Sequence, residues 1–345
     1  MSKAASGAMT TKAKAMFAKR LSESDYINLA NKKSVSEIAT YLKNETYYAQ
    51  CLDGVNEKAL HRGQLEALIR NDYIAKVAKI LRYSASNREG FEKVIVTQSE
   101  VNTLIAITQA IVAGDFGSVV TKLPTTIESE ICFDLKELAN VRSFDELVEA
   151  LVKTPYHDIL ANYASGDIRD MDFVGLEQDL YRYYHEETLK ALKESIDTKS
   201  QKTIRDLLYS QIELDNIAKI YRLKKYFNTP KEKIGPMLSP VYLRFSKKDI
   251  EDMIERMDAE HIYERLINSS YKAYVKEERF LFIEHTTKMI NYNLNHRQIM
   301  FANDPDTVLL AYMRLVENEI DNIVDIIEGV RYRVSSEEIR RMLIY

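Results

Sequence analysis

The chain has 345 residues, of which 46% are hydrophobic and 29% are charged, and its formal net charge is −4. These values are ordinary for a globular protein with a sizeable core, and they argue against a nucleic-acid binder, which carries a basic excess. Ten glycines and six prolines are few helix breakers for this length, so the composition predicts an all-α fold built from long helices.

The first third of the chain shows no sign of membrane insertion. The opening twenty residues hold basic side chains but no apolar stretch of signal-peptide length. The longest uncharged apolar run, residues 101–114, has 14 residues, whereas a membrane span needs about 20. This run therefore predicts a buried core helix. Cys51 and Cys132 form no CxxC pair, and we interpret them as buried thiols of a cytosolic protein.

Three elements recur in the same order along the chain. The first is SVSEIATYLKNETYY from Ser34, which resembles SFDELVEALVKTPY from Ser143 and, more faintly, SKKDIEDMIERM from Ser246. The second is a Leu-Glu or Ile-Glu pair. Its glutamates are Glu66, Glu177 and Glu284. Internal repetition at a fixed spacing indicates that one structural unit is used several times.

The third element is the clearest. ELDNIAKIYRLKKY at 213–226 and EIDNIVDIIEGVRY at 319–332 lie 106 positions apart. The alignment pairs Glu213 with Glu319, Asn216 with Asn322, and Tyr226 with Tyr332. A weaker copy begins at Glu100, without the asparagine and without the Lys-Tyr element.

The ordered set predicts three tandem helical units in one compact body. Their bounds are residues 1–125 (the most divergent unit), 126–240 and 241–345. The segments 114–126 and 228–240 contain 7 of the chain's 16 Gly and Pro residues, so they are predicted to be the turns between units.

Local signals predict where several helices begin. Thr229 with Glu232 and Ser335 with Glu338 have the spacing of a capping box, and Pro230 suits the first turn of the earlier helix. Asn303-Asp304-Pro305-Asp306 predicts the start of a long helix from Asp306 to Gly329, which Gly329 would end or kink.

The sequence lacks the usual signatures of an enzyme. No histidine has a glutamate three positions before it, and no GxxxxGK[ST], GxGxxG or GxSxG motif occurs. Asp321 and Asp325 stand four apart, but a metal site needs more converging oxygens. We therefore predict no catalytic residue, no metal and no cofactor, and that the chain neither binds nor hydrolyses ATP.

The repeated polar residues are better explained as structural. Catalytic groups are seldom present in every repeat, so Glu213 with Asn216 and Glu319 with Asn322 are predicted to hydrogen-bond to a neighbouring helix. The basic residues near the two helix ends allow two interpretations: they face a partner, or they neutralise the dipole of their own helix. These residues are Lys224, Lys225, Arg331 and Arg333.

Taken together, these elements resemble the C subunit of bacterial and archaeal V/A-type rotary ATPases, the counterpart of the d subunit of the eukaryotic V-ATPase. The resemblance rests on the repeated Glu-x-(Asp/Asn)-Asn-(Ile/Leu) segments, on SFDELVEALVKTPY at 143–156, and on AKAMFAKRLSESDYINL at 13–29. It covers essentially the whole chain. The first unit departs from the pattern because it lacks the asparagine and the Lys-Tyr element.

The resemblance implies a fold and a function. The fold would be three related helical units around a pseudo-three-fold axis, shaped as a funnel. The protein would be a non-catalytic component of the central stalk, one copy per complex. It would seat the D and F subunits of the rotor shaft on the membrane proteolipid ring (c/K subunits) and transmit torque for H⁺ or Na⁺ transport. It would lie in the cytoplasm, attached to the membrane only through the complex.

Two alternatives remain open at this point. A generic all-α repeat scaffold unrelated to ATPases would also show internal repetition, although solenoid repeats run about 20–50 residues and the spacing here is near 110. An all-α enzyme with a carboxylate-bound metal is the other.

Overall fold

The structure is a computed structural model that describes residues 3–83, 88–115, 127–164, 168, 171–195, 198–275 and 280–345. In these residues the regular elements are α-helices and short 3-10 helices, with no strand, which confirms the all-α prediction. The chain divides into two compact units. Unit 1 comprises residues 1–32 and 196–345, and unit 2 comprises residues 33–195.

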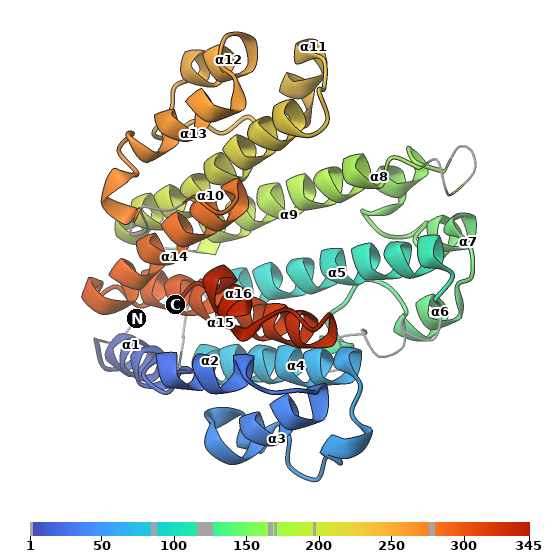
Figure 1. Cartoon of the computed structure of the whole chain (residues 1–345), viewed down its shortest axis with the longest axis vertical. Helices are drawn as coiled ribbons and strands as arrows, with labels where there is room; N and C mark the ends of the chain where they lie inside the picture. Colours follow the sequence, from blue (N-terminus) through green and yellow to red (C-terminus); the bar gives the residue numbers. More distant parts are fainter. Residues whose placement is uncertain are drawn as a thin grey trace. The chain divides into compact units, whose positions relative to one another are not determined.

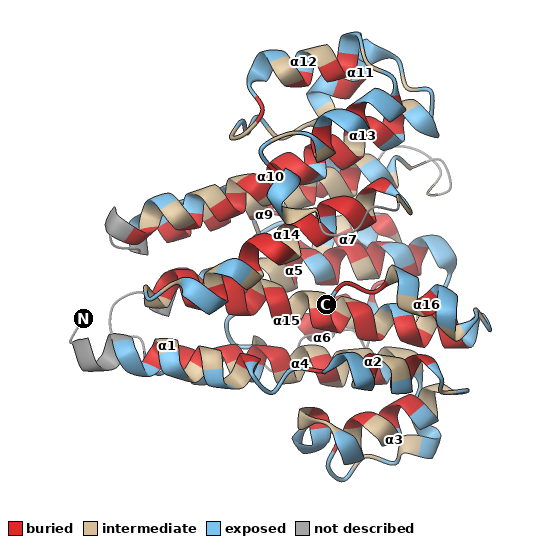
Figure 2. Cartoon of the chain, turned by 60° about the vertical axis from the view of Figure 1, so that its left-hand side comes forward, coloured by how far each residue is buried: buried red, intermediate tan, exposed pale blue. Residues whose placement is uncertain are grey.

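Unit 1 is organised around one long helix. Its elements are α1 (Lys3–Phe17), α2 (Glu23–Ala30), α10 (Thr198–Lys225), α11 (Lys231–Ile234), η7 (Gly235–Met237), α12 (Lys247–Glu255), α13 (Ala259–Ile267), η8 (Lys272–Tyr274), α14 (Ile283–Phe301), α15 (Pro305–Arg331) and α16 (Ser336–Met342). Helix α15 packs against α14, α1, α10, α16 and α2, and Figure 2 shows it as largely buried. The core of unit 1 therefore surrounds α15.

Helix α15 starts where the sequence predicts and ends later than expected. The Asp304 carboxylate accepts the backbone N–H of Thr307 at 2.9 Å, and Pro305 occupies the first turn, which confirms the predicted start. The prediction that Gly329 ends the helix is wrong, because α15 continues to Arg331. A kink at Gly329 stays a prediction. A Cβ atom at Gly329 would lie 2.5 Å from Cγ1 of Ile339 in α16. The glycine therefore allows α16 to pack closely on α15.

The two predicted capping boxes have different outcomes. At Ser335 the hydroxyl accepts the Glu338 N–H at 3.2 Å, while the Glu338 carboxylate accepts the Ser335 N–H at 3.3 Å, so this box is confirmed. The box at Thr229 is wrong. Pro230 stands at the N-cap of α11 and no side chain caps the helix, which lasts one turn before the 3-10 turn η7 begins.

Unit 2 is built on an adjacent pair of long helices. Its elements are α3 (Val35–Glu45), η1 (Tyr47–Gln50), η2 (Glu57–Ala59), α4 (Arg62–Leu81), α5 (Arg88–Ala113), α6 (Leu135–Asn140), α7 (Phe144–Ala150), α8 (His157–Ala161) and α9 (Phe173–Ser195). Helices α5 and α9 lie side by side (Figure 1). Val101, Leu104 and Ile107 of α5 are buried, as predicted for a core helix. Among the described helices, none combines the length and the apolarity that a membrane span requires.

The division into two compact units differs from the three predicted sequence units. Compactness and sequence repetition are separate properties, so the three-unit division at 125/126 and 240/241 stays a prediction. Most of the predicted first turn segment, residues 116–126, lies outside the described residues. The second, 228–240, contains α11 and η7.

Candidate functional site

The carboxylate of Glu213 is buried in unit 1, on α10, and holds a segment of backbone. It accepts the N–H groups of Leu243 at 2.8 Å, Arg244 at 3.1 Å and Phe245 at 3.0 Å. It also accepts the Tyr271 hydroxyl at 2.8 Å. Burial and the Glu213 charge raise the pKa of Tyr271, so this hydroxyl stays protonated and donates. Four donors occupy the carboxylate, an arrangement suited to anchoring the chain that approaches α12.

Asn216 lies one turn further along α10 and pairs with the backbone of a single residue. Its Nδ2 donates to the Ser239 carbonyl at 2.8 Å, and its Oδ1 accepts the Ser239 N–H at 3.1 Å. A side-chain amide that both donates to and accepts from one residue fixes the position of that residue. Glu213 and Asn216 thus contact residues of one connecting segment, 239–245.

In unit 2, Glu100 of α5 makes a smaller version of this site. Its carboxylate accepts the Cys132 N–H at 2.7 Å and the Tyr156 hydroxyl at 2.7 Å. Thr103 stands where the other copies have asparagine, and its hydroxyl bonds within α5, to the Ser99 carbonyl at 2.7 Å. This replacement accounts for the missing asparagine of the copy at Glu100.

The third copy, on α15, receives backbone from two distant parts of the chain. Glu319 accepts the Leu21 N–H at 2.8 Å. Asn322 donates to the Ile344 carbonyl at 2.7 Å and accepts the Ile344 N–H at 3.0 Å. Its Nδ2 also lies 3.3 Å from the Tyr26 hydroxyl. Burial and the nearby Glu319 charge raise the pKa of Tyr26.

The sequence analysis did not identify Tyr156 and Tyr271, whose hydroxyls donate to the repeated glutamates Glu100 and Glu213, although a signal for these tyrosines exists. A Thr-x-Tyr or Ser-x-Tyr step follows one helix of each copy, and its hydroxyl accepts the tyrosine N–H while donating to a carbonyl of the preceding turn. The steps are Thr46 with Tyr48, Thr154 with Tyr156, and Ser269 with Tyr271, at 3.2, 3.2 and 3.1 Å between hydroxyl oxygen and tyrosine nitrogen.

This geometry corrects one sequence assignment. The predicted position of the third copy of the first recurring element, at Ser246, is wrong, because the helix before Ser269 is α13, whose N-cap is Asp258. Ser246 caps the preceding helix, α12, through a complete capping box with Asp249. The capping-box pattern at Ser246 therefore marks α12, the helix before the repeated one.

The basic residue Lys224 is held by a neighbouring helix. Its ammonium group donates to the carbonyls of Met253 at 2.8 Å and Ile254 at 2.6 Å, and to that of Met257. These carbonyls stand at and just beyond the C-terminal end of α12, where a cation offsets the helix dipole. Burial lowers the pKa of Lys224. Dipole neutralisation therefore acts on α12 rather than on the lysine's own helix.

The other three basic candidates lie at the surface. Lys225 pairs with Glu260, and Arg331 pairs with Glu328 at 3.2 Å on its own helix. Arg333 is exposed, with a φ of 57°. Whether any of them contacts a partner stays a prediction.

Exposed aromatic residues end both long helices of unit 1. Tyr226 is 59% exposed and Phe227 60% exposed after α10, and Tyr332 is 73% exposed after α15. Each of these ends is followed by a residue with positive φ, Asn228 or Arg333. Large side chains that the core does not use are candidates for contact with another protein.

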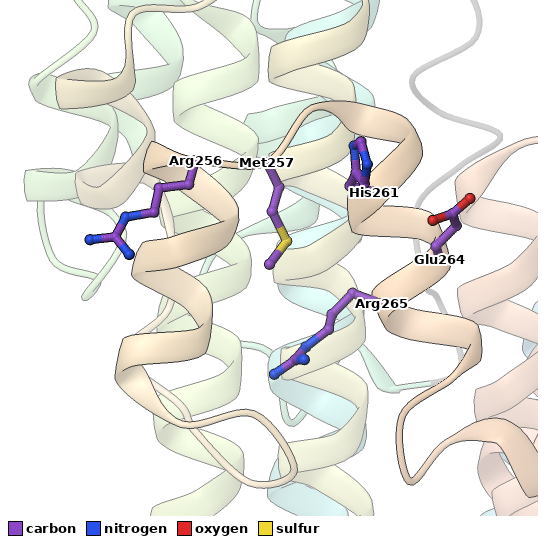
Figure 3. A pocket seen from close by; sticks show the side chains of 5 residues that line it. All are labelled: Arg256, Met257, His261, Glu264 and Arg265. Atoms are coloured by element: carbon purple, nitrogen blue, oxygen red, sulfur yellow. The ribbon is translucent and has the colours of Figure 1, made fainter.

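Helices α12 and α13 enclose a shallow depression that is open to solvent. Figure 3 shows its five labelled side chains pointing in different directions. Its two arginines and its histidine are already paired with carboxylates on, or directly before, the same two helices. The pairs are Arg256 with Asp252 at 3.4 Å, His261 with Asp258 at 2.8 Å, and Arg265 with Asp249 at 2.7 Å. The depression therefore offers no converging set of groups for a ligand. No cluster suited to a metal ion occurs among the described residues.

The two cysteines are less buried than the sequence predicted. Cys132 is exposed and Cys51 is half-buried, so the interpretation as two buried thiols is wrong. Both have a pKa raised to about 12. For Cys132 the causes are partial burial and then the charge of Glu100. For Cys51 they are burial and then Asp72.

Replacing Glu100 by glutamine should therefore activate Cys132. Removing the negative charge lowers the pKa of the Cys132 thiol, and each unit of pKa corresponds to about a tenfold larger thiolate fraction. We expect alkylation of Cys132 by iodoacetamide near pH 9 to become about tenfold faster, as measured by mass spectrometry of the folded protein. Cys51 serves as an internal control, and its rate should not change. Equal rates at Cys132 before and after the substitution would contradict the assigned cause.

The fold and these sites define an all-helical protein in which repeated carboxylates and amides hold the chain to itself. The model of the ATP synthase (C/AC39) subunit family matches residues 9–342. The chain therefore belongs to this family, and the resemblance seen in the sequence is confirmed.

Curated proteins similar to the chain are named as C subunits of A-type ATP synthases. The chain is 23% identical to the C subunit of the A-type ATP synthase of Archaeoglobus fulgidus, in an alignment covering 97% of this chain and 95% of that protein. It is 22% identical to the corresponding protein of Methanosphaera stadtmanae, covering 96% and 86%. With the Desulfurococcus sp. protein it shares 26% identity over 60% of this chain and 55% of the relative. That last alignment spans about half of the relative's length.

Proposed function

We propose that this protein is a non-catalytic component of the central stalk of a V/A-type rotary ATPase. It seats the shaft formed by the D and F subunits on the membrane proteolipid ring (c/K subunits) and transmits torque for H⁺ or Na⁺ transport. One copy serves each complex, in the cytoplasm and peripheral to the membrane. The observation that carries the proposal is the family match over residues 9–342. A match of that extent favours this function over a generic helical scaffold.

The repeated glutamates and asparagines form hydrogen bonds within their own chain, which supports a structural role. Glu100, Glu213 and Asn322 bind backbone and tyrosine groups of their own chain, so their side chains are engaged in holding the fold. In this role the protein neither binds nor hydrolyses ATP. Its contribution to the complex is mechanical.

Long helices suit a part that bears torque. Helix α10 has 28 residues and α15 has 27, which corresponds to about 40 Å each at 1.5 Å per residue. Side chains packed at crystal-like density resist deformation. Partner contacts must then be made by exposed residues, and a stable joint buries roughly 1,600 Å² in total.

A pull-down tests the proposal directly. The tagged full chain is mixed with a D/F shaft and, separately, with a detergent-solubilised proteolipid ring. Recovery of both supports the proposal. Recovery of neither overturns it, as does ATPase activity that stays with the pure chain through successive columns.

The exposed aromatic residues provide a sharper version of this test. Replacing Tyr332 by alanine should weaken binding of the shaft or the ring about 30-fold, because aromatic interface residues often carry about 2 kcal/mol each. Replacing Tyr226 and Phe227 together removes two such residues and should weaken binding about 1,000-fold. The melting temperature should stay unchanged, since these side chains are exposed.

A matched control is Tyr83→Ala, another exposed tyrosine (44%) placed in unit 2. It should bind like the unmodified chain. If the unit 1 variants recover partners as well as Tyr83→Ala does, the helix ends are not contact sites. The pull-down of the unmodified chain still decides the function.

A further inference from the structure

Two polar sites in unit 1 hold backbone in the same way but differ in how the chain reaches them. Asn216 on α10 makes a pair of hydrogen bonds with Ser239, at 2.8 and 3.1 Å. Asn322 on α15 makes the same pair with Ile344, at 2.7 and 3.0 Å. The glutamate one turn earlier accepts further backbone N–H groups: Glu213 accepts three, including that of Phe245, and Glu319 accepts that of Leu21.

At α10 these contacts belong to one continuous segment. Ser239 at the asparagine and Phe245 at the glutamate are six residues apart in the sequence. At α15 the corresponding donors are Ile344 and Leu21, which lie at opposite ends of the sequence. The α15 site is therefore filled by two segments that no short piece of chain connects.

Leu21 belongs to a segment formed by α1, α2 and their flanks, residues 3–32, which we call the arm. The arm packs on α15 and α16 and leads at its far end into unit 2, which begins at residue 33. Several of its contacts are polar. Lys14 donates to the Ala302 carbonyl beyond α14 at 2.8 Å, and Leu21 donates to Glu319 at 2.8 Å.

Residues 343–345, which we call the strap, lie beside the arm. Asn318 and Asn322 both donate to the Ile344 carbonyl, at 2.6 and 2.7 Å. The ring of Tyr345 stacks on Tyr26 of the arm, with ring centroids 4.7 Å apart. Asn322 also contacts the Tyr26 hydroxyl at 3.3 Å. One asparagine therefore touches both the strap and the arm.

We infer that the arm is a separately opening element of unit 1, and that Asn322 with the strap controls its docking. The arm can leave α15 by breaking only non-covalent contacts, and its buried side chains Met9, Phe17 and Leu29 then lose their environment together. Such a segment opens as one cooperative unit below the free energy of global unfolding. Along the chain, the arm is separated from the rest of unit 1 by the whole of unit 2, residues 33–195. Segment 239–245 instead lies between η7 and α12 of its own unit and has no such separation.

Native-state hydrogen exchange on the full chain tests this inference with matched amides. The Leu21 amide, bound to Glu319, should exchange about tenfold or more faster than the Phe245 amide, bound to Glu213. It should exchange together with the amides of α1 and α2. If the Leu21 amide exchanges as slowly as the Phe245 amide, the inference is overturned. The same holds if only the Ile344 amide exchanges rapidly, because this would show fraying of the strap alone.

Paired substitutions separate control from simple destabilisation. Asn322→Ala should accelerate exchange throughout the arm, whereas Asn216→Ala should accelerate exchange only near Ser239 and Phe245. If Asn322→Ala fails to fold, Tyr345→Ala replaces it, because it removes one stacked ring that is 46% exposed. Arm amides that respond equally to the α10 and α15 variants would refute the inference.

Discussion

Replacing Glu213 by alanine should lower the free energy of unfolding of unit 1 by about 3–5 kcal/mol. The substitution removes the acceptor of three backbone N–H groups and of the Tyr271 hydroxyl, and a buried donor without a partner costs about 1–3 kcal/mol. The expected loss is smaller than four full costs of this kind, because Leu243 and Arg244 are half-buried and their amides can bind water. Urea denaturation followed by far-UV circular dichroism measures the change.

Two variants control for this prediction. Glu213→Gln keeps one acceptor oxygen and should lose about half as much stability. Glu251→Ala removes an exposed carboxylate of α12 that lies 3.8 Å from Lys247, and it should change stability by less than about 0.5 kcal/mol. If Glu213→Ala is as mild as Glu251→Ala, the buried carboxylate does not anchor the chain.

Replacing Gly329 by valine should lower the free energy of unfolding by about 1–3 kcal/mol. Its new Cβ would stand 2.5 Å from Cγ1 and 2.7 Å from Cδ1 of Ile339, and overpacking of this kind has that typical cost. Helix propensity differs little between glycine and valine, so the steric clash decides whether the free energy of unfolding falls or rises. The same urea denaturation measures it.

A double-mutant cycle with Ile339→Ala tests the assigned contact. Removing the isoleucine side chain relieves the clash, so the two substitutions together should cost about 1–2 kcal/mol less than the sum of their separate effects. Strict additivity would show that the valine acts elsewhere, and a stable Gly329→Val would show that α16 adjusts without strain.

The sequence predicted best those features whose partners lie close in the chain. Ser335 and Glu338 satisfy each other across three residues, and Asp304 with Pro305 starts α15, because hydroxyl, carboxylate and proline act on the next turn of backbone. Thr229 shows the limit of this reasoning. It has the spacing of a capping box, yet Pro230 takes the N-cap of a helix only one turn long.

Contacts between distant segments were harder to predict. The sequence shows that Glu213 and Glu319 recur. It does not show what they bind, because their partners include backbone N–H groups, which every residue except proline carries. Tyr271 could have been found from the Ser-x-Tyr step, had the third copy been aligned at Asp258 instead of Ser246. The exposure of Tyr226 and Tyr332 depends on tertiary packing, which local pattern does not reveal.

Because Glu100, Glu213 and Glu319 bind backbone groups, many substitutions are compatible with these three sites. A carboxylate that binds main-chain N–H groups places little demand on the side chains that follow them, apart from excluding proline. Leu243-Arg244-Phe245, Cys132 and Leu21 meet their glutamates in the same manner while sharing almost no residue identity. The three sites can therefore keep a glutamate bound to backbone as their sequences diverge. The copy at Glu100 matches the others weakly in sequence, yet its glutamate still accepts a backbone N–H group.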